Sequence, residues 1–127
     1  MKVSLIKEKA YNFALTIIKL YKLLIEKNEY VLSKQLLKSG TSIGSNVEEA
    51  LAGQSRPDFL AKMSIASKEA RESNYWLRLL RDGKIIDQKH LEGPLVESDE
   101  LIRMLTAIVK TTMQTSKTKN PKLRTQN

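Results

Sequence analysis

The sequence predicts an all-α protein folded as an up-down-up-down antiparallel four-helix bundle. Between residues 59 and 80, apolar or small residues recur at spacings of four and three, the pattern with which packed helices contact one another. Three further segments, each roughly 20 to 30 residues long, carry a similar rhythm. The connections between the four segments are short, as expected for antiparallel neighbours, and no segment alternates as a half-buried strand does.

The first helix is expected over about residues 4–27. Further apolar residues flank its main stripe on both sides, so the apolar arc spans about 180°, whereas contact with one core requires about 100°. The excess predicts a second apolar contact outside the subunit, with Phe13 and Leu20 on one flank as candidates. The stripe itself consists of Ala10, Ala14, Ile17, Tyr21 and Leu24.

The second helix is expected over about residues 30–51. Its middle, residues 39–45, is rich in glycine and serine, and each glycine disfavours helix by about 1 kcal/mol relative to alanine. One interpretation is a loop near Gly40. The other is a continuous helix whose small residues let a neighbouring backbone approach closely. The apolar spacing stays in phase from Leu36 to Val47, which favours the continuous helix.

The third helix is expected over about residues 56–82. Ser55 is a typical N-cap residue, Pro57 suits the first turn, and Asp58 lies near the positive end of the helix dipole. Gly83 suits a left-handed position at the C-terminus. Phe59 begins the apolar stripe and is expected in the core.

The fourth helix is expected over about residues 87–115, with a kink or a short separate turn before Pro94. One bundle domain over residues 1–115 would then be followed by a tail over residues 116–127. The tail has almost no apolar surface to bury, so we expect it to be disordered. It is also basic, with Lys117, Lys119, Lys122 and Arg124.

Composition excludes several classes of protein. The 127 residues contain no cysteine, so disulfides and thiolate metal sites are excluded, which fits a reducing compartment. Charged residues interrupt the N-terminal segment and no apolar run approaches the roughly 20 residues of a membrane span. We therefore expect a soluble cytoplasmic protein without a membrane role. The net charge of +8 favours polyanions such as RNA or DNA as partners.

The sequence offers little for catalysis. A di-iron site in a four-helix bundle needs two Glu-x-x-His pairs, and the chain has one histidine, His90, with no acid three residues before it. No phosphate loop, nucleophile elbow or dinucleotide fingerprint is present. The prediction is a protein that is not an enzyme and that needs no metal or cofactor.

The third helix carries two surfaces besides its core stripe. Lys68, Arg71, Tyr75 and Arg78, here called the basic stripe, combine cations for phosphates with a ring that can stack on an unpaired base. The alternative is a solvated face with ion pairs such as Arg78–Asp82. Large apolar residues on the other edge predict an oligomer interface, unless Trp76 only laps over the edge of the bundle. They are Ile65, Trp76 and Leu79.

Five short segments carry a resemblance to a known family. They are residues 39–50 (SGTSIGSNVEEA), Asp58-Phe59, residues 62–66 (KMSIA), residues 68–73 (KEARES) and residues 75–80 (YWLRLL). In these segments the chain resembles the four-helix-bundle proteins known as 23S rRNA intervening-sequence proteins. That family is distantly similar to the accessory variability protein of diversity-generating retroelements, a basic pentamer that binds nucleic acid and a reverse transcriptase.

The resemblance implies a left-handed bundle that assembles as a ring, with five subunits as the expected number. It supplies no catalytic residue. The function predicted from residues and resemblance together is a non-enzymatic homo-oligomer that binds nucleic acid through the basic stripe and the tail. The alternative is an assembly scaffold for a protein partner, with no direct role in nucleic-acid binding.

Overall fold

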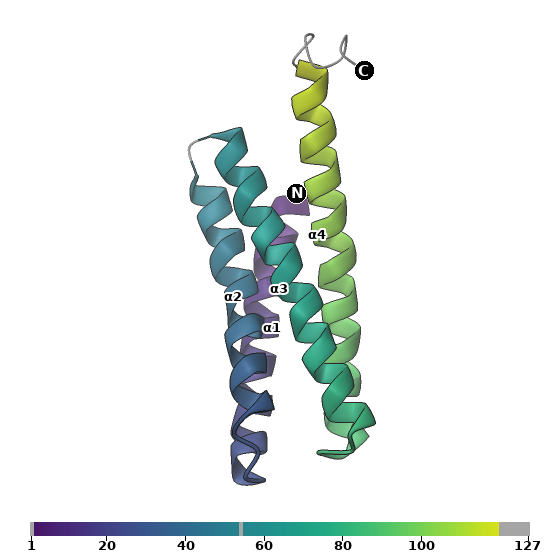
Figure 1. Ribbon diagram of the computed structural model, residues 1–127. Coiled ribbons are helices and arrows are strands. Elements are labelled where there is room, and N and C mark those ends of the chain that lie inside the picture. Colours follow the sequence, from purple (N-terminus) through teal and green to yellow (C-terminus); the bar gives the residue numbers. More distant parts are fainter. Residues whose placement is uncertain (1, 54, 120–127) are drawn as a thin grey trace.

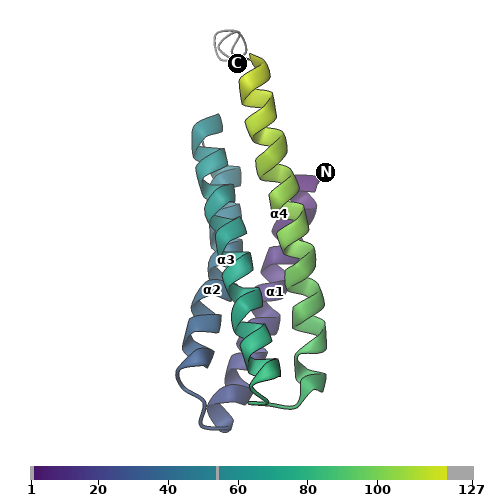
Figure 2. The same ribbon diagram turned by 45° about the vertical axis from the view of Figure 1, so that its right-hand side comes forward.

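A computed structural model describes residues 2–53 and 55–119, with side chains over 5–53 and 55–115. It contains four long helices, α1 (Lys2–Glu26), α2 (Leu32–Ala52), α3 (Arg56–Asp82) and α4 (Glu92–Lys119), and one turn of 3₁₀ helix, η1 (Gln88–His90). No strand occurs within these ranges. Successive helices run in opposite directions (Figures 1 and 2), so the predicted up-down-up-down bundle is confirmed.

Packing around the bundle is uneven. α2 packs on α1 and α3, and α4 packs mainly on α3 and less on α1. Figure 1 shows that α3 and α4 lie close together near the turn that joins them and diverge toward the opposite end, where the last turns of α4 extend past the other helices. Apolar residues on the C-terminal half of α4 therefore have fewer partners than their periodicity suggests.

The continuous second helix is confirmed, and its glycines face α1. A Cβ added at Gly40 would lie 2.8 Å from Cγ1 of Ile17, and one at Gly44 would lie 3.5 Å from the carbonyl oxygen of Ala10. Small residues in the middle of α2 thus let α1 approach closely, which accounts for their presence despite a low helix propensity.

The ends of the helices follow the sequence signals, with one correction. The Ser55 hydroxyl accepts a hydrogen bond from the Asp58 amide at 3.2 Å, as an N-cap does. Gly83, expected to be left-handed, is right-handed (φ −79°), and Lys84 holds the left-handed position (φ 55°). The Ile85 amide donates to the Leu80 carbonyl across this turn, so the capping motif lies one residue later than expected.

The start of α4 agrees with the separate turn expected before Pro94, because η1 precedes the helix. Pro94 occupies the first turn of α4, where no intrahelical amide bond is lost. At its other end α4 is helical through Lys119, so the tail was predicted to begin four residues too early. Residues 120–127 lie outside the described part of the chain.

The observed burial of side chains contradicts two predictions about the core. Phe13 is fully buried and Leu20 is 5% exposed, so both belong to the subunit's own core and offer no surface to a second subunit. Phe59 is only partly buried. The core is formed by one face of each helix and includes Ile6, Phe13, Ile17, Leu24, Leu36, Ile43, Val47, Met63, Leu77, Leu80, Leu101 and Leu105.

Candidate nucleic-acid interface

The basic stripe lies on the outer face of α3, where its four residues are exposed or partly exposed. α2 contacts one side of α3 through a buried hydrogen bond from the Ser73 hydroxyl to the Ser39 hydroxyl (2.8 Å). α4 contacts the other side through a buried bond from the Asn74 amide to the Ser98 hydroxyl (2.9 Å). The structure thus brings the four predicted residues together on the surface between these two contacts.

Arg78 and Tyr75 contact each other rather than acting separately. The Arg78 guanidinium carbon lies 5.6 Å from the centre of the Tyr75 ring, within the range of a cation–π contact. Arg78 Nε also donates to the side-chain oxygen of Asn74 at 2.9 Å. Tyr75 is 46% exposed, and Arg78 covers part of its stacking surface. The predicted Arg78–Asp82 ion pair is replaced by an Arg81–Asp82 pair at 2.8 Å.

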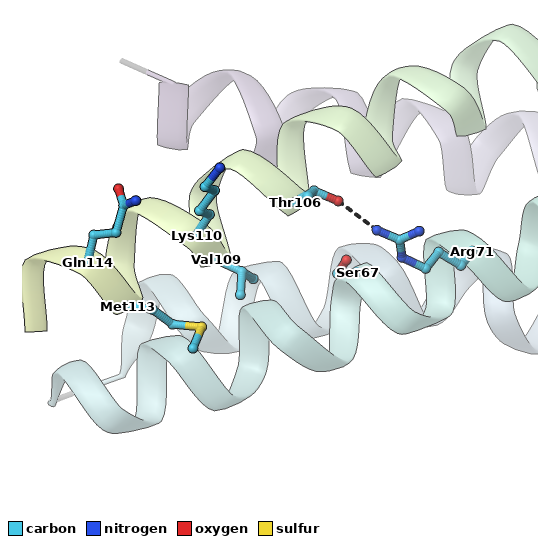
Figure 3. Close-up of a pocket in the computed structure, with 7 residues that line it drawn as sticks. All are labelled: Ser67, Arg71, Thr106, Val109, Lys110, Met113 and Gln114. Carbon is cyan, nitrogen blue, oxygen red and sulfur yellow. Dashed lines mark hydrogen bonds between the residues drawn. The ribbon is translucent and has the colours of Figure 1, made fainter. Parts of the chain in front are cut away.

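Arg71 joins the basic stripe to α4. One guanidinium nitrogen donates to the Thr106 hydroxyl at 2.9 Å, at the end of a surface groove between the two helices. We call it the α3–α4 groove, and its volume is about 360 Å³. Figure 3 shows the residues that line it, which are Ser67, Arg71, Thr106, Val109, Lys110, Met113 and Gln114.

Charge is distributed unevenly across the outer face of α3. The residues lining the α3–α4 groove include two cations, Arg71 and Lys110, and no carboxylate. Carboxylates lie toward the α2 side, where burial raises the pKa of Glu69 and the neighbouring Glu72 raises that pKa further, against the opposing effects of Lys68 and Lys38. The lining of the α3–α4 groove is therefore the most favourable part of this face for a polyanion, and the carboxylate on the α4 side, Asp99, lies beside Asn74, from which it accepts a hydrogen bond at 3.1 Å.

The predicted apolar interface is partly exposed. Ile65 is 41% exposed and Leu79 is 37% exposed, while Trp76 packs against the core with a buried indole Nε1 that has no hydrogen-bond partner. On α1 the exposed apolar residues include Tyr11 and Ile18, on the flank opposite Phe13 and Leu20. Apolar surface thus remains on both helices, on α1 at different residues from those predicted.

The predicted tail residues are only partly covered by the structure. Lys117 and Lys119 belong to the helical backbone of α4, beyond the last described side chain. Lys122 and Arg124 lie outside the described residues.

Neither a metal cluster nor a membrane-spanning helix occurs in the described part of the chain. No group of three or more His, Cys, Asp or Glu side chains among these residues lies close enough to hold a metal ion. None of the described helices combines the length and the apolar character needed to cross a bilayer.

Comparison with known proteins identifies the family. A model of the family described as 23S rRNA-intervening sequence protein matches residues 3–107. The chain therefore belongs to the 23S rRNA-intervening sequence protein family. No curated protein matches it.

A related protein of solved structure has the same fold as this chain. It is a protein of unknown function from the S23 ribosomal protein family of Bacteroides thetaiotaomicron VPI-5482, with 46% sequence identity and a TM-score of 0.83. The alignment covers 87% of this chain and 99% of that one. The fold of the 23S rRNA-intervening sequence protein family is thus known from a solved structure, whereas family membership does not establish an activity.

The sequence did not predict the part of the site that α4 contributes. Sequence analysis did not single out Thr106 or Lys110, and Val109 and Met113 continue the four-residue apolar spacing that begins at the buried Leu105. In the structure Val109 is partly buried and Met113 is 48% exposed. Periodicity could not separate them from core residues, because their exposure results from the divergence of α3 and α4.

Proposed function

We propose that this member of the 23S rRNA-intervening sequence protein family is a non-enzymatic, homo-oligomeric module that binds nucleic acid. The binding surface is the α4 side of the α3 outer face, with contributions from the C-terminal lysines and arginine. Lys and Arg at this surface neutralise phosphates, the interaction that supplies most sequence-independent affinity.

One observation supports this proposal most directly. Arg71 and Lys110 come from different helices and line one groove whose lining residues include no acid. Lys68 and Arg78 continue the positive surface along α3, and both are accessible to solvent. Two cations drawn from different helices, in a groove whose lining contains no carboxylate, fit a phosphate backbone better than a face of balanced ion pairs does.

The double substitution Arg71→Glu/Arg78→Glu tests the binding surface. Both side chains are exposed, so the variant should remain folded, whereas its affinity for nucleic acid should fall at least tenfold because two phosphate contacts become repulsive. The measurement is fluorescence anisotropy with labelled oligonucleotides. The control is Lys7→Glu/Lys34→Glu, which changes the net charge equally at solvent-accessible positions on α1 and α2. An equal loss of nucleic-acid affinity in the two double variants would contradict the assignment of the binding surface to α3.

The assembly part of the proposal rests on exposed apolar surface. Ile65, Leu79 and the partly buried Trp76 form an apolar edge beside the basic stripe, and a second subunit can bury it. We propose five subunits, the number that the family resemblance implies. A ring of this kind would repeat each basic surface five times and so raise the affinity for a long polyanion.

Leu79→Glu tests the assembly. A charge placed in an apolar contact should dissociate the oligomer, since an unpaired charge is costly to bury. Light scattering should give several 14.5 kDa subunits for the wild type and fewer for the variant. Val96→Glu, at a 67% exposed position on α4, is the matched control and should leave the mass unchanged. A wild-type protein that is monomeric at micromolar concentration would contradict the proposal.

The alternative function is a scaffold that binds a protein partner through the same apolar edge. It predicts an oligomer with no measurable affinity for RNA or DNA at low salt, so the anisotropy measurement separates the two functions.

A further inference from the structure

We propose that the α3–α4 groove binds a nucleotide of a single-stranded nucleic acid, with a phosphate between Arg71 and Lys110 and a base against Val109 and Met113. This inference rests on the proposed nucleic-acid function and adds the site and the kind of strand. It follows from the cations at the groove, from its apolar floor and from a comparison with the other grooves.

The cations suit a phosphate. A guanidinium carries five N–H donors, and the hydrogen bond to Thr106 uses one of them and fixes the direction of Arg71. Lys110 follows Thr106 by four residues on α4, so the two side chains lie on the same side of that helix. Arg71 and Lys110 both line the groove, and Figure 3 shows Arg71 at one end of it and Lys110 on α4 with its side chain directed away from α3. A backbone that crosses the groove would therefore meet a positive charge from each helix.

The floor suits an unpaired base. Val109 and Met113 point from α4 toward α3 (Figure 3), and Met113 is 48% exposed although it belongs to the apolar face of α4. A flat apolar ring can cover these side chains. The faces of a base in a duplex are already stacked on its neighbours, so only an unpaired base can enter. Duplexes can still contact Arg71 and Lys110 through phosphates.

Two other grooves of the described chain lack this combination. One, between α1, α3 and α4, has a volume of about 590 Å³ and contains Glu100 together with Arg103. The other, between α1 and α2, contains Glu8 and Glu48. In both grooves carboxylates offset the cations, which are Arg103 in the first and Lys7 in the second, and Glu100 also pairs with Lys9 at 3.0 Å. The charged residues lining the α3–α4 groove are cations alone, so charge complementarity favours that groove.

The experiment compares two variants with two matched controls by fluorescence anisotropy, using the full chain, unstructured single strands of RNA and of DNA, and a DNA duplex. Met113→Ser removes part of the floor and should weaken both single strands about tenfold, with less than a twofold effect on the duplex. Val96→Ser removes an apolar, 67% exposed side chain elsewhere on α4 and should change nothing. Lys110→Gln should weaken every strand more than Arg103→Gln, which removes the same charge from another groove.

The outcomes separate this proposal from the function on which it rests. If the wild type binds but Met113→Ser has the same small effect as Val96→Ser, the groove proposal is overturned while nucleic-acid binding stands. Equal effects of Lys110→Gln and Arg103→Gln would overturn it as well. If the wild type binds none of the strands at low salt, both proposals fall. If Met113→Ser lowers the affinity for single-stranded RNA and for single-stranded DNA by different factors, the larger loss would identify the preferred strand and would support the site.

Discussion

Leu77→Ala is expected to lower the free energy of unfolding by about 3–4 kcal/mol, more than Phe59→Ala, which is expected to lower it by about 1–2 kcal/mol. Leu77 on α3 is fully buried, so its removal leaves a cavity that the packed helices cannot fill. Phe59 is the larger side chain, but it is only partly buried and lines the open groove between α1, α3 and α4.

Urea denaturation measures both free energies of unfolding. The two variants are compared at one protein concentration, because self-association would make the apparent stability depend on concentration. The position of Phe59 in the apolar stripe of the third helix would by itself predict the opposite order. A larger loss for Phe59→Ala than for Leu77→Ala would contradict the order expected from burial and would mean that the groove beside Phe59 is covered in solution.

Gly40→Ala is expected to lower the free energy of unfolding by about 1–2 kcal/mol, although alanine is the better helix former by about 1 kcal/mol. The added Cβ would lie 2.8 Å and 2.9 Å from the two γ carbons of Ile17. A β-branched side chain has few rotamers with which to move away, so the two helices must separate.

The control for Gly40→Ala is Gly93→Ala, because nothing lies within 4 Å of a Cβ added at Gly93. That variant should be neutral or slightly stabilising. The double variant Gly40→Ala/Ile17→Ala should lose less stability than the sum of the single losses, since Ile17→Ala removes the atoms that collide. Strict additivity would show that Gly40 is not the point of close approach between α1 and α2.

Most of the fold could be predicted from periodicity and helix-end signals. The seven residues between 39 and 45 remained helical because the apolar spacing of α2 continues through them, and the N-cap predicted at Ser55 is confirmed. The C-terminal end of α3 was less predictable. A left-handed residue is required there, but the hydrogen bonds of the turn place it at Lys84 rather than at the neighbouring glycine.

The wide apolar arc of α1 shows what periodicity leaves open. An arc of about 180° contains two overlapping faces of about 100°, and either can turn toward the core. The structure turns Phe13 and Leu20 inward and leaves Tyr11 and Ile18 exposed. The prediction that apolar surface exceeds the needs of one core was sound, while the choice of flank was wrong.

The candidate site was only half predictable, because it depends on the angle between two helices. The cations on α3 follow from spacing alone. Their neighbours on α4 depend on the divergence of α3 and α4, which a one-dimensional pattern does not encode. The contact between the buried Asn74 and Ser98 could not be predicted for the same reason, since it joins α3 to α4, whereas the contact of Asn74 with Arg78 lies within α3 at a spacing of four residues.

The salt dependence of the affinity of the full chain for a single-stranded oligonucleotide is the sharpest test of nucleic-acid binding through this basic surface. Each phosphate contact releases counterions and contributes about 0.7 to the slope of log K against log salt for a single strand. With Lys68, Arg71, Arg78 and Lys110 in contact, we expect binding that weakens with a slope of about −3 between about 50 and 200 mM salt, and with a steeper slope where the C-terminal cations also contact phosphates. Binding that is absent at about 50 mM salt, or that is unchanged at about 200 mM, would contradict this function.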